Sequence, residues 1–164
     1  MKKKQKRSIT LAAIAVIAIA LVIWNNYSAE QTKIKGFNFG NDLQQIQEDL
    51  KNLQEEFEAN LSMYKDGEMT REEFLDFAPT HIKQMEELIS RYDDLSPPPS
   101  FGASVELLQS STESQLEEEG LLIRWIDTGN EADRIKANEL HQEALEFELA
   151  GIASFDEAKA GNTP

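Results

Sequence analysis

The chain has 164 residues, a formal net charge of −14 and no cysteine, which excludes disulfides, thiolate catalysis and cysteine-based zinc sites. Beyond the first 29 residues, eleven Lys or Arg stand against thirty Asp or Glu, a formal charge near −19. So acidic a surface repels phosphates, and nucleic acid is therefore excluded as a partner.

An apolar run from Ser8 to Trp24 contains no charged residue, glycine or proline. Five cations precede it: Lys2, Lys3, Lys4, Lys6 and Arg7. A helix rises about 1.5 Å per residue, so this run reaches roughly 25 Å, close to the apolar thickness of a bilayer. Cations on one flank hold that flank in the cytoplasm. We therefore predict a cytoplasmic basic tail over 1–7 and a transmembrane signal anchor over 8–27. Residues 8–24 would contact membrane lipid, and the remaining chain would be extracytoplasmic.

A cleaved signal peptide is the alternative for this segment, because signal peptides also begin with cations. The apolar run is longer than the usual core of a signal peptide. Tyr27-Ser28-Ala29 is also a poor cleavage site, since its first residue is bulky. Cleavage would give a secreted protein, so both interpretations place the domain outside the cytoplasm.

Residues 28–40 are rich in Asn and Gly and predict a linker. From residue 41 to 65, apolar residues recur at spacings of three and four, which is typical of an amphipathic helix. The apolar positions are Leu43, Ile46, Leu50, Leu53, Phe57 and Tyr64.

The segment 62–73 resembles the calcium loop of the EF-hand family, with Gly67 at the sixth position and Glu73 at the last. That resemblance would imply a bound calcium ion. The third position, however, is Tyr64, which cannot supply the hard oxygen ligand that calcium needs. We therefore predict a glycine turn followed by a capping box between Thr70 and Glu73.

The second predicted helix runs from this capping box to about Asp94. Its apolar face consists of Phe74, Ala78, Ile82, Met85, Leu88, Ile89 and Tyr92. Pro79 lies inside this helix and predicts a kink or a break near Phe77. The prolines at 97–99 end the helix, because residues before proline avoid the helical conformation.

The third predicted helix runs from about Pro99 to Ile126 and has apolar ends but a polar middle. In a bundle, the inward positions of that middle would be near Thr112, Gln115 and Glu119. Either this helix lies at a solvent-facing corner or bends at Gly120, or the bundle contains an internal polar layer. The run Glu117-Glu118-Glu119 predicts a solvated charged surface.

The fourth predicted helix runs from Glu131 to about Lys159, after a left-handed cap at Gly129 and an N-cap at Asn130. Its broad apolar face consists of Ile135, Leu140, Ala144, Leu145, Phe147, Leu149, Ile152 and Phe155. Four helices of similar length with short turns predict an all-α fold. We expect an up-down-up-down antiparallel four-helix bundle over 41–160, with a three-helix bundle and one splayed helix as the alternative.

The sequence contains no recognisable catalytic, phosphate-binding or metal-binding motif, so we expect no enzyme activity, cofactor or metal. The expected role is binding, with a protein or cell-envelope partner. The alternative is a ligand-binding or sensory bundle. Counting outward from each turn places His81, Gln115 and His141 at about one height, where they would form a polar ligand site.

Overall fold

The computed structural model describes residues 38–161, which contain four α-helices and no strand. The predicted basic tail and membrane anchor, and the linker up to residue 37, lie outside the described residues. Within 38–161, no helix is both long enough and apolar enough to cross a membrane. The chain from Phe39 onward forms one compact unit. The prediction of an all-α helical bundle is confirmed for this described part.

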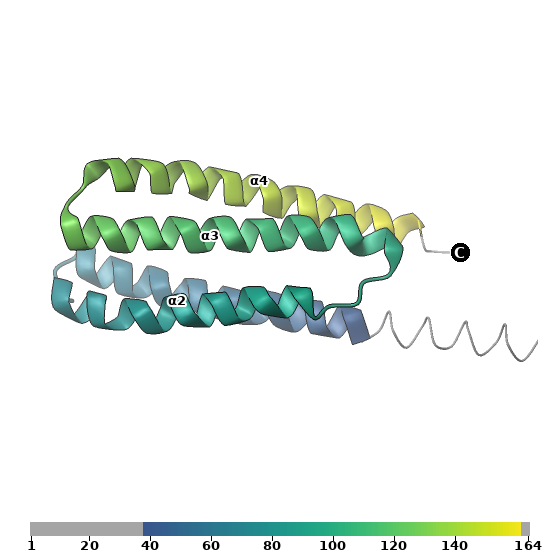
Figure 1. Cartoon of the computed structure of the whole chain (residues 1–164), viewed down its shortest axis with the longest axis horizontal. Helices are drawn as coiled ribbons and strands as arrows, with labels where there is room; N and C mark the ends of the chain where they lie inside the picture. Colours follow the sequence, from purple (N-terminus) through teal and green to yellow (C-terminus); the bar gives the residue numbers. More distant parts are fainter. Residues whose placement is uncertain (1–37, 162–164) are drawn as a thin grey trace, which may run out of the picture. The chain divides into compact units, whose positions relative to one another are not determined.

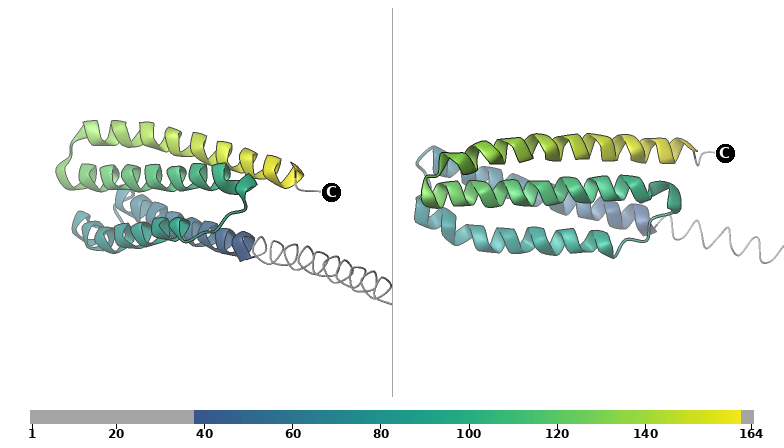
Figure 2. Two further views of the ribbon diagram at one scale, coloured as in Figure 1. Left: turned by 45° about the vertical axis from the view of Figure 1, so that its right-hand side comes forward. Right: turned by 45° about the horizontal axis from the view of Figure 1, so that its top comes forward.

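The four helices form two antiparallel hairpins (Figures 1 and 2). The first hairpin pairs the helix over 38–65 with α2, Arg71–Asp93. A short 3-10 turn, η1, Pro99–Phe101, leads into the second hairpin. This hairpin pairs α3, Gly102–Thr128, with α4, Glu131–Gly161, and α3 also packs against α2.

Residues 38–40 of the predicted linker are helical and continuous with the first helix, which the structure describes over 38–65. Phe39 is buried, and the centroid of its ring lies 5.6 Å from that of the Phe101 ring. The Phe101 ring in turn lies 4.9 Å from that of Phe155 near the end of α4. This aromatic cluster packs Phe39 into the core, so residues 38–40 belong to the bundle and not to the predicted linker.

The predicted turns agree with the structure. Gly67 has a φ of 77°, which glycine adopts without strain. The Thr70 hydroxyl accepts a hydrogen bond from the backbone N–H of Glu73, whose carboxylate accepts one from the N–H of Thr70, so the capping box is present. Gly129 ends α3 with a φ of 72°, and its N–H donates to the carbonyl of Trp125 at 2.7 Å.

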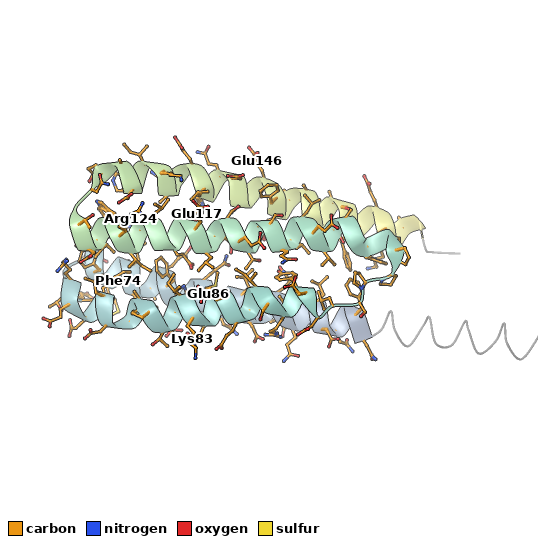
Figure 3. The ribbon with its side chains drawn as sticks, in the orientation of Figure 1. Phe74, Lys83, Glu86, Glu117, Arg124 and Glu146 are labelled. Atoms are coloured by element: carbon orange, nitrogen blue, oxygen red, sulfur yellow. The ribbon has the colours of Figure 1, made fainter. Side chains whose placement is uncertain are left out.

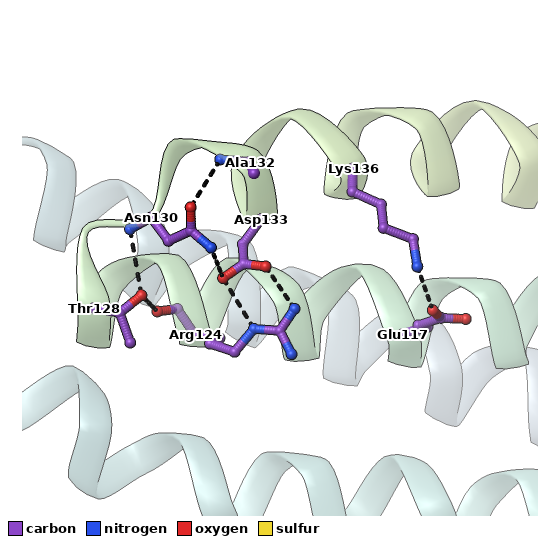
Figure 4. A network of polar contacts seen from close by, with 7 residues as sticks. All are labelled: Glu117, Arg124, Thr128, Asn130, Ala132, Asp133 and Lys136. Atoms are coloured by element: carbon purple, nitrogen blue, oxygen red, sulfur yellow. Dashed lines mark hydrogen bonds and ion pairs between the residues drawn. The ribbon is translucent and has the colours of Figure 1, made fainter.

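The turn between α3 and α4 is held by side-chain hydrogen bonds (Figure 4). The side chain of Asn130 accepts from the N–H of Ala132 at 3.2 Å, as expected of an N-cap. Arg124 Nε donates to the Asp133 carboxylate at 2.9 Å, which joins the last turn of α3 to the first turn of α4. Farther along, Lys136 Nζ lies 3.4 Å from Glu117 Oε1.

Of the predicted kink or break near Phe77, the break is wrong, because α2 runs continuously through Pro79. Proline cannot donate to the carbonyl of Leu75, one turn earlier. Pro79 lies on the exposed side of α2, where solvent can hydrate the carbonyl that loses its helical partner.

Large apolar side chains fill the space between the two hairpins. Figure 3 shows Phe74 on the inner side of α2 and Lys83 on its outer side. The buried core near η1 consists of Phe39, Leu43, Ile46, Leu50, Met85, Leu88, Tyr92, Val105 and Leu108. The core near the turns consists of Phe57, Leu61, Phe74 and Ile126.

The contact between α3 and α4 contains small residues as well as leucines. Ala137, Ala144 and Gly151 are buried at a spacing of seven along α4. A Cβ atom added at Gly151 would lie 2.9 Å from Leu108 Cγ and 3.3 Å from the Leu108 backbone nitrogen. The two helices therefore approach so closely at this point that a side chain on Gly151 would be crowded.

Arg71 joins the two hairpins at the end of the bundle where both turns lie (Figure 1). Its Nε donates to the carbonyl of Ile126 at 3.1 Å, and its Nη2 donates to the carbonyl of Asp127 at 2.6 Å. The same guanidinium forms an ion pair with the Asp127 carboxylate. These contacts also satisfy carbonyls in the last turn of α3, which have no partner within the helix.

Candidate binding site

The inward face of α3 is polar. Its buried polar residues are Ser104, Ser111, Thr112, Gln115 and Glu119. Apart from the adjacent pair Ser111 and Thr112, successive residues are three, four or seven positions apart, so all five lie on one side of the helix. Glu119 is only 5% exposed and Gln115 only 9%. The interpretation of α3 as a solvent-facing corner is therefore wrong, and α3 runs through Gly120 without interruption. The bundle contains an internal polar layer.

His81 and Glu119 form the deepest part of this layer. His81 is fully buried on α2, and its Nε2 lies 2.8 Å from Glu119 Oε2. The imidazole stacks on the Phe57 ring at 4.9 Å and contacts the Phe77 ring at 5.4 Å. Its Nδ1 is buried with no hydrogen-bond partner among the described residues.

Burial raises the pKa of the Glu119 carboxyl above its ordinary value, and the hydrogen bond from His81 and the charge of His81 offset part of this increase. The negative charge of Glu58 acts in the same direction as burial. A carboxyl of this kind binds its proton more tightly than a solvated one.

A second set of hydrogen bonds in the layer includes Tyr92 and Thr112. Gln47 donates to the Tyr92 hydroxyl at 2.6 Å, and that hydroxyl lies 3.2 Å from Thr112 Oγ1. Thr112 also donates to the carbonyl of Leu108 at 3.0 Å. Burial raises the pKa of Tyr92, so the phenol keeps its proton and its hydrogen-bonding role at neutral pH.

Gln115 connects three helices. Its side-chain oxygen accepts a hydrogen bond from Gln54 of helix 38–65, and its side-chain nitrogen donates to Ser111 Oγ at 3.3 Å. Ser111 donates in turn to the carbonyl of Ala144 on α4 at 2.8 Å. A continuous polar connection therefore crosses the bundle from helix 38–65 to α4.

This polar connection forms the floor of an open groove of about 280 Å³ between helix 38–65, α3 and α4, which we call the acidic groove. Its polar lining consists of Gln54, Glu58, Gln115, Glu118, Glu119, His141 and Glu148. Within residues 38–161, two of its four carboxylates have an ion-pair partner, Glu119 in His81 and Glu118 in His141. A neighbouring hollow of about 250 Å³ shares Gln54, Gln115 and Glu148 with this groove, and Lys51 lies on its wall.

Of the three predicted ligand-binding residues, Gln115 and His141 both line the acidic groove, while His81 lies beneath it. His141 is exposed, and its Nδ1 lies 3.2 Å from Glu118 Oε2. Each of the two histidines lies next to a different carboxylate. Glu119 connects His81 to the groove, since it contacts His81 and also lines the groove.

The prediction that Glu117-Glu118-Glu119 is a solvated run holds only for Glu117, which is exposed. Glu118 is half-buried and Glu119 is buried, because each step along a helix turns the side chain by about 100°. Burial raises the pKa of Glu118 as well, and His141 offsets part of the increase.

Comparisons with protein-family models, curated proteins and solved structures found no match for this chain. The site must therefore be interpreted from its own geometry. Within the described residues, no group of three or more His, Asp or Glu side chains is arranged to hold a metal ion.

The wall of the acidic groove continues into an apolar surface on α4. Leu145 lines the groove, and Leu149 and Ile152 follow it at one-turn spacings on the same side of the helix. Their exposed fractions are 48%, 59% and 47%. We call these three residues the α4 stripe. They belong to the apolar face predicted for this helix, but only part of that face is buried.

Proposed function

We propose that this protein is a membrane-anchored, extracytoplasmic helical bundle that acts by binding a partner protein and is not an enzyme. The α4 stripe is the observation that carries this proposal. Large apolar side chains exposed together on a monomeric domain are typical of protein interaction sites. Their position beside the acidic groove gives the surface an apolar part and a charged part, as binding interfaces usually have.

The proposed anchor follows from the apolar run 8–24 and the five cations before it. Protease added to intact spheroplasts should degrade the bundle, while a peptide containing 8–24 stays in the membrane fraction. Protection of the bundle would reverse the proposed orientation. A mature product without 8–24 would favour secretion after signal cleavage.

The proposed binding surface can be tested by placing a photoreactive amino acid at Leu149 in the full-length chain in its native membranes. We expect one discrete crosslinked partner protein. The matched control carries the same photoreactive residue at Lys83, which is exposed on the outer side of α2 (Figure 3). The partner should be absent from the control and should also be lost when Leu145→Glu is combined with the Leu149 probe. The same partner crosslinked at both positions would contradict the proposed surface.

A ligand-binding or sensory role for the polar layer is the second candidate. It is favoured by the connection from His81 through Glu119 into a groove that also contains Gln115 and His141. Gln115→Leu distinguishes the two roles, because it removes the polar link to Gln54 without changing the α4 stripe. Crosslinking at Leu149 should survive this change if the partner binds the stripe. A loss of crosslinking with the fold intact would favour control by the polar layer.

A further inference from the structure

The α4 stripe has the geometry of a helix-packing face. Leu145, Leu149 and Ile152 occupy positions i, i+4 and i+7 of one continuous helix. The neighbouring face of α4, which includes Ala144 and Gly151, is already used by α3. α4 therefore carries a second apolar face that no described element of the chain covers, and an additional helix could pack there in the usual way.

The charge beside this face is negative. The acidic groove holds Glu58, Glu118, Glu119 and Glu148, and His141 is the one basic side chain that lines it. The pKa of Glu118 is raised mainly by burial and also by the charges of Glu119 and Glu58, which act on it together. A cationic group in the groove would relieve this repulsion.

The acidic groove and the neighbouring hollow adjoin along helix 38–65. Together they take their lining from residues 47–61 of that helix and from 141–148 of α4. At about 1.5 Å per residue, the lining extends roughly 20 Å along helix 38–65 and roughly 10 Å along α4. Hollows that follow helices in this way suit an amphipathic helix laid in a groove.

We propose that the acidic groove and the α4 stripe together bind a cationic amphipathic helix of a partner protein. Its apolar side packs on Leu145, Leu149 and Ile152, and its Lys or Arg side chains face Glu58, Glu118 and Glu148. This inference rests on the proposed binding function and specifies the chemistry of the partner.

Charge favours this occupant over a second copy of the chain. Two copies packed through α4 would bring together two domains whose formal charge is near −19, with the carboxylates of both grooves close to the contact. Lys51 is the one lysine on the wall of the neighbouring hollow, and it already pairs with Glu55 at 3.6 Å. A cationic helix meets the opposite sign of charge along the whole groove.

The test uses the full-length chain in nanodiscs of neutral phosphatidylcholine. The probe is a synthetic peptide of about 20 residues with Leu on one face and Lys on the other, long enough to form a helix when bound. A benzophenone at the centre of its apolar face reports its position after irradiation and mass spectrometry. The controls are a scrambled peptide of the same composition, a peptide with Glu in place of Lys, and nanodiscs without protein.

We expect saturable labelling at one peptide per chain, concentrated at residues 145–152. Leu149→Glu should weaken binding by about tenfold or more, because it places a charge at the centre of an apolar contact. The pair Glu118→Gln and Glu148→Gln should weaken binding by about tenfold. A matched pair with the same change of charge, Glu86→Gln and Glu139→Gln, should leave it nearly unchanged, since both residues are exposed outside the groove.

Three outcomes would overturn the inference: labelling spread over the whole acidic surface, equal binding of the scrambled peptide, or equal binding of the Glu peptide. The photoreactive residue at position 149, used to test the proposed function, gives a further check. Crosslinks from it to α4 of a second copy, or to the basic residues 2–7 of the same chain, would identify a different occupant and overturn the inference. Failure of the peptide while Leu149 still crosslinks a partner protein would leave the proposed function intact. Loss of both the peptide binding and the partner crosslink at Leu149 would refute the inference and the proposed function.

Discussion

His81 is fully enclosed, and among residues 38–161 only its Nε2 has a hydrogen-bond partner, the Glu119 carboxylate at 2.8 Å. Burying an ionised carboxylate is unfavourable unless its hydrogen bonds replace those of water. One imidazole N–H replaces only part of that hydration, which agrees with the raised pKa of Glu119. The pair is therefore expected to specify how α2 and α3 are aligned and to add little stability.

Glu119→Gln tests this interpretation. A carboxyl whose pKa is raised by folding binds its proton more tightly in the folded chain, so its contribution to stability increases as pH falls through the raised pKa. The contribution is complete below the ordinary value of 4.5. Glutamine keeps an oxygen that can accept from His81 Nε2 and carries no charge. We expect the variant to be more stable than the parent at pH 8, with the difference shrinking toward pH 5.

Urea unfolding across this pH range, followed by circular dichroism, measures the effect. Glu117→Gln is the control, because Glu117 is exposed on the same helix. The difference in stability between this variant and the parent should be nearly the same at every pH. A variant that is less stable than the parent at pH 8, with the loss disappearing on acidification, would show that the ionised pair is stabilising.

At the scale of the element, α4 is held to α3 by close approach. At Gly151, an added Cβ atom would lie 2.9 Å from the Leu108 side chain and 3.3 Å from its backbone nitrogen. Small residues bring two helices close together and leave bulky residues on the flanks. The exposure of Leu145 and Leu149 follows from the same geometry.

Gly151→Ala and Gly120→Ala make a matched pair for this contact. Replacing glycine by alanine inside a helix normally stabilises the protein by about 1 kcal/mol. Gly120 has nothing within 4 Å of its added Cβ, so that variant should show the gain. Gly151→Ala should instead lose about 1 kcal/mol, because Leu108 must shift. Thermal unfolding of both variants measures these changes in stability. An equal gain in stability for Gly151→Ala and Gly120→Ala would show that α4 is free to move away from α3.

At the scale of the whole molecule, the four helices, the two glycine turns and the capping box could be predicted from the sequence. Each of these depends on local periodicity or on backbone chemistry. The inward positions Thr112, Gln115 and Glu119 also followed from periodicity once α3 was placed in a bundle. The sequence left open whether this face lay inside the bundle, because a polar helix face is equally typical of a solvent-exposed corner.

Pairings across helices could not be predicted in the same way. Periodicity marks Ala144 and Leu145 alike as apolar, so it cannot decide which of them faces α3. The distance between the helices decides it, and that distance depends on the partner residues of another helix. The pairing of His81 with Glu119 likewise depends on an alignment to within one turn, which counting residues from a loop does not determine.

The bridge made by Arg71 has a consequence for folding kinetics. Each hairpin forms from contacts close in sequence, whereas Arg71 and Asp127 are separated by 56 residues and meet only after the hairpins have docked. An interaction that forms after the transition state slows unfolding and leaves the folding rate unchanged. Arg71→Ala should therefore lose about 1 kcal/mol and unfold about fivefold faster, with the same folding rate. A stopped-flow chevron plot separates the two rates, and a slower folding limb would mean that the turn end of the bundle assembles first.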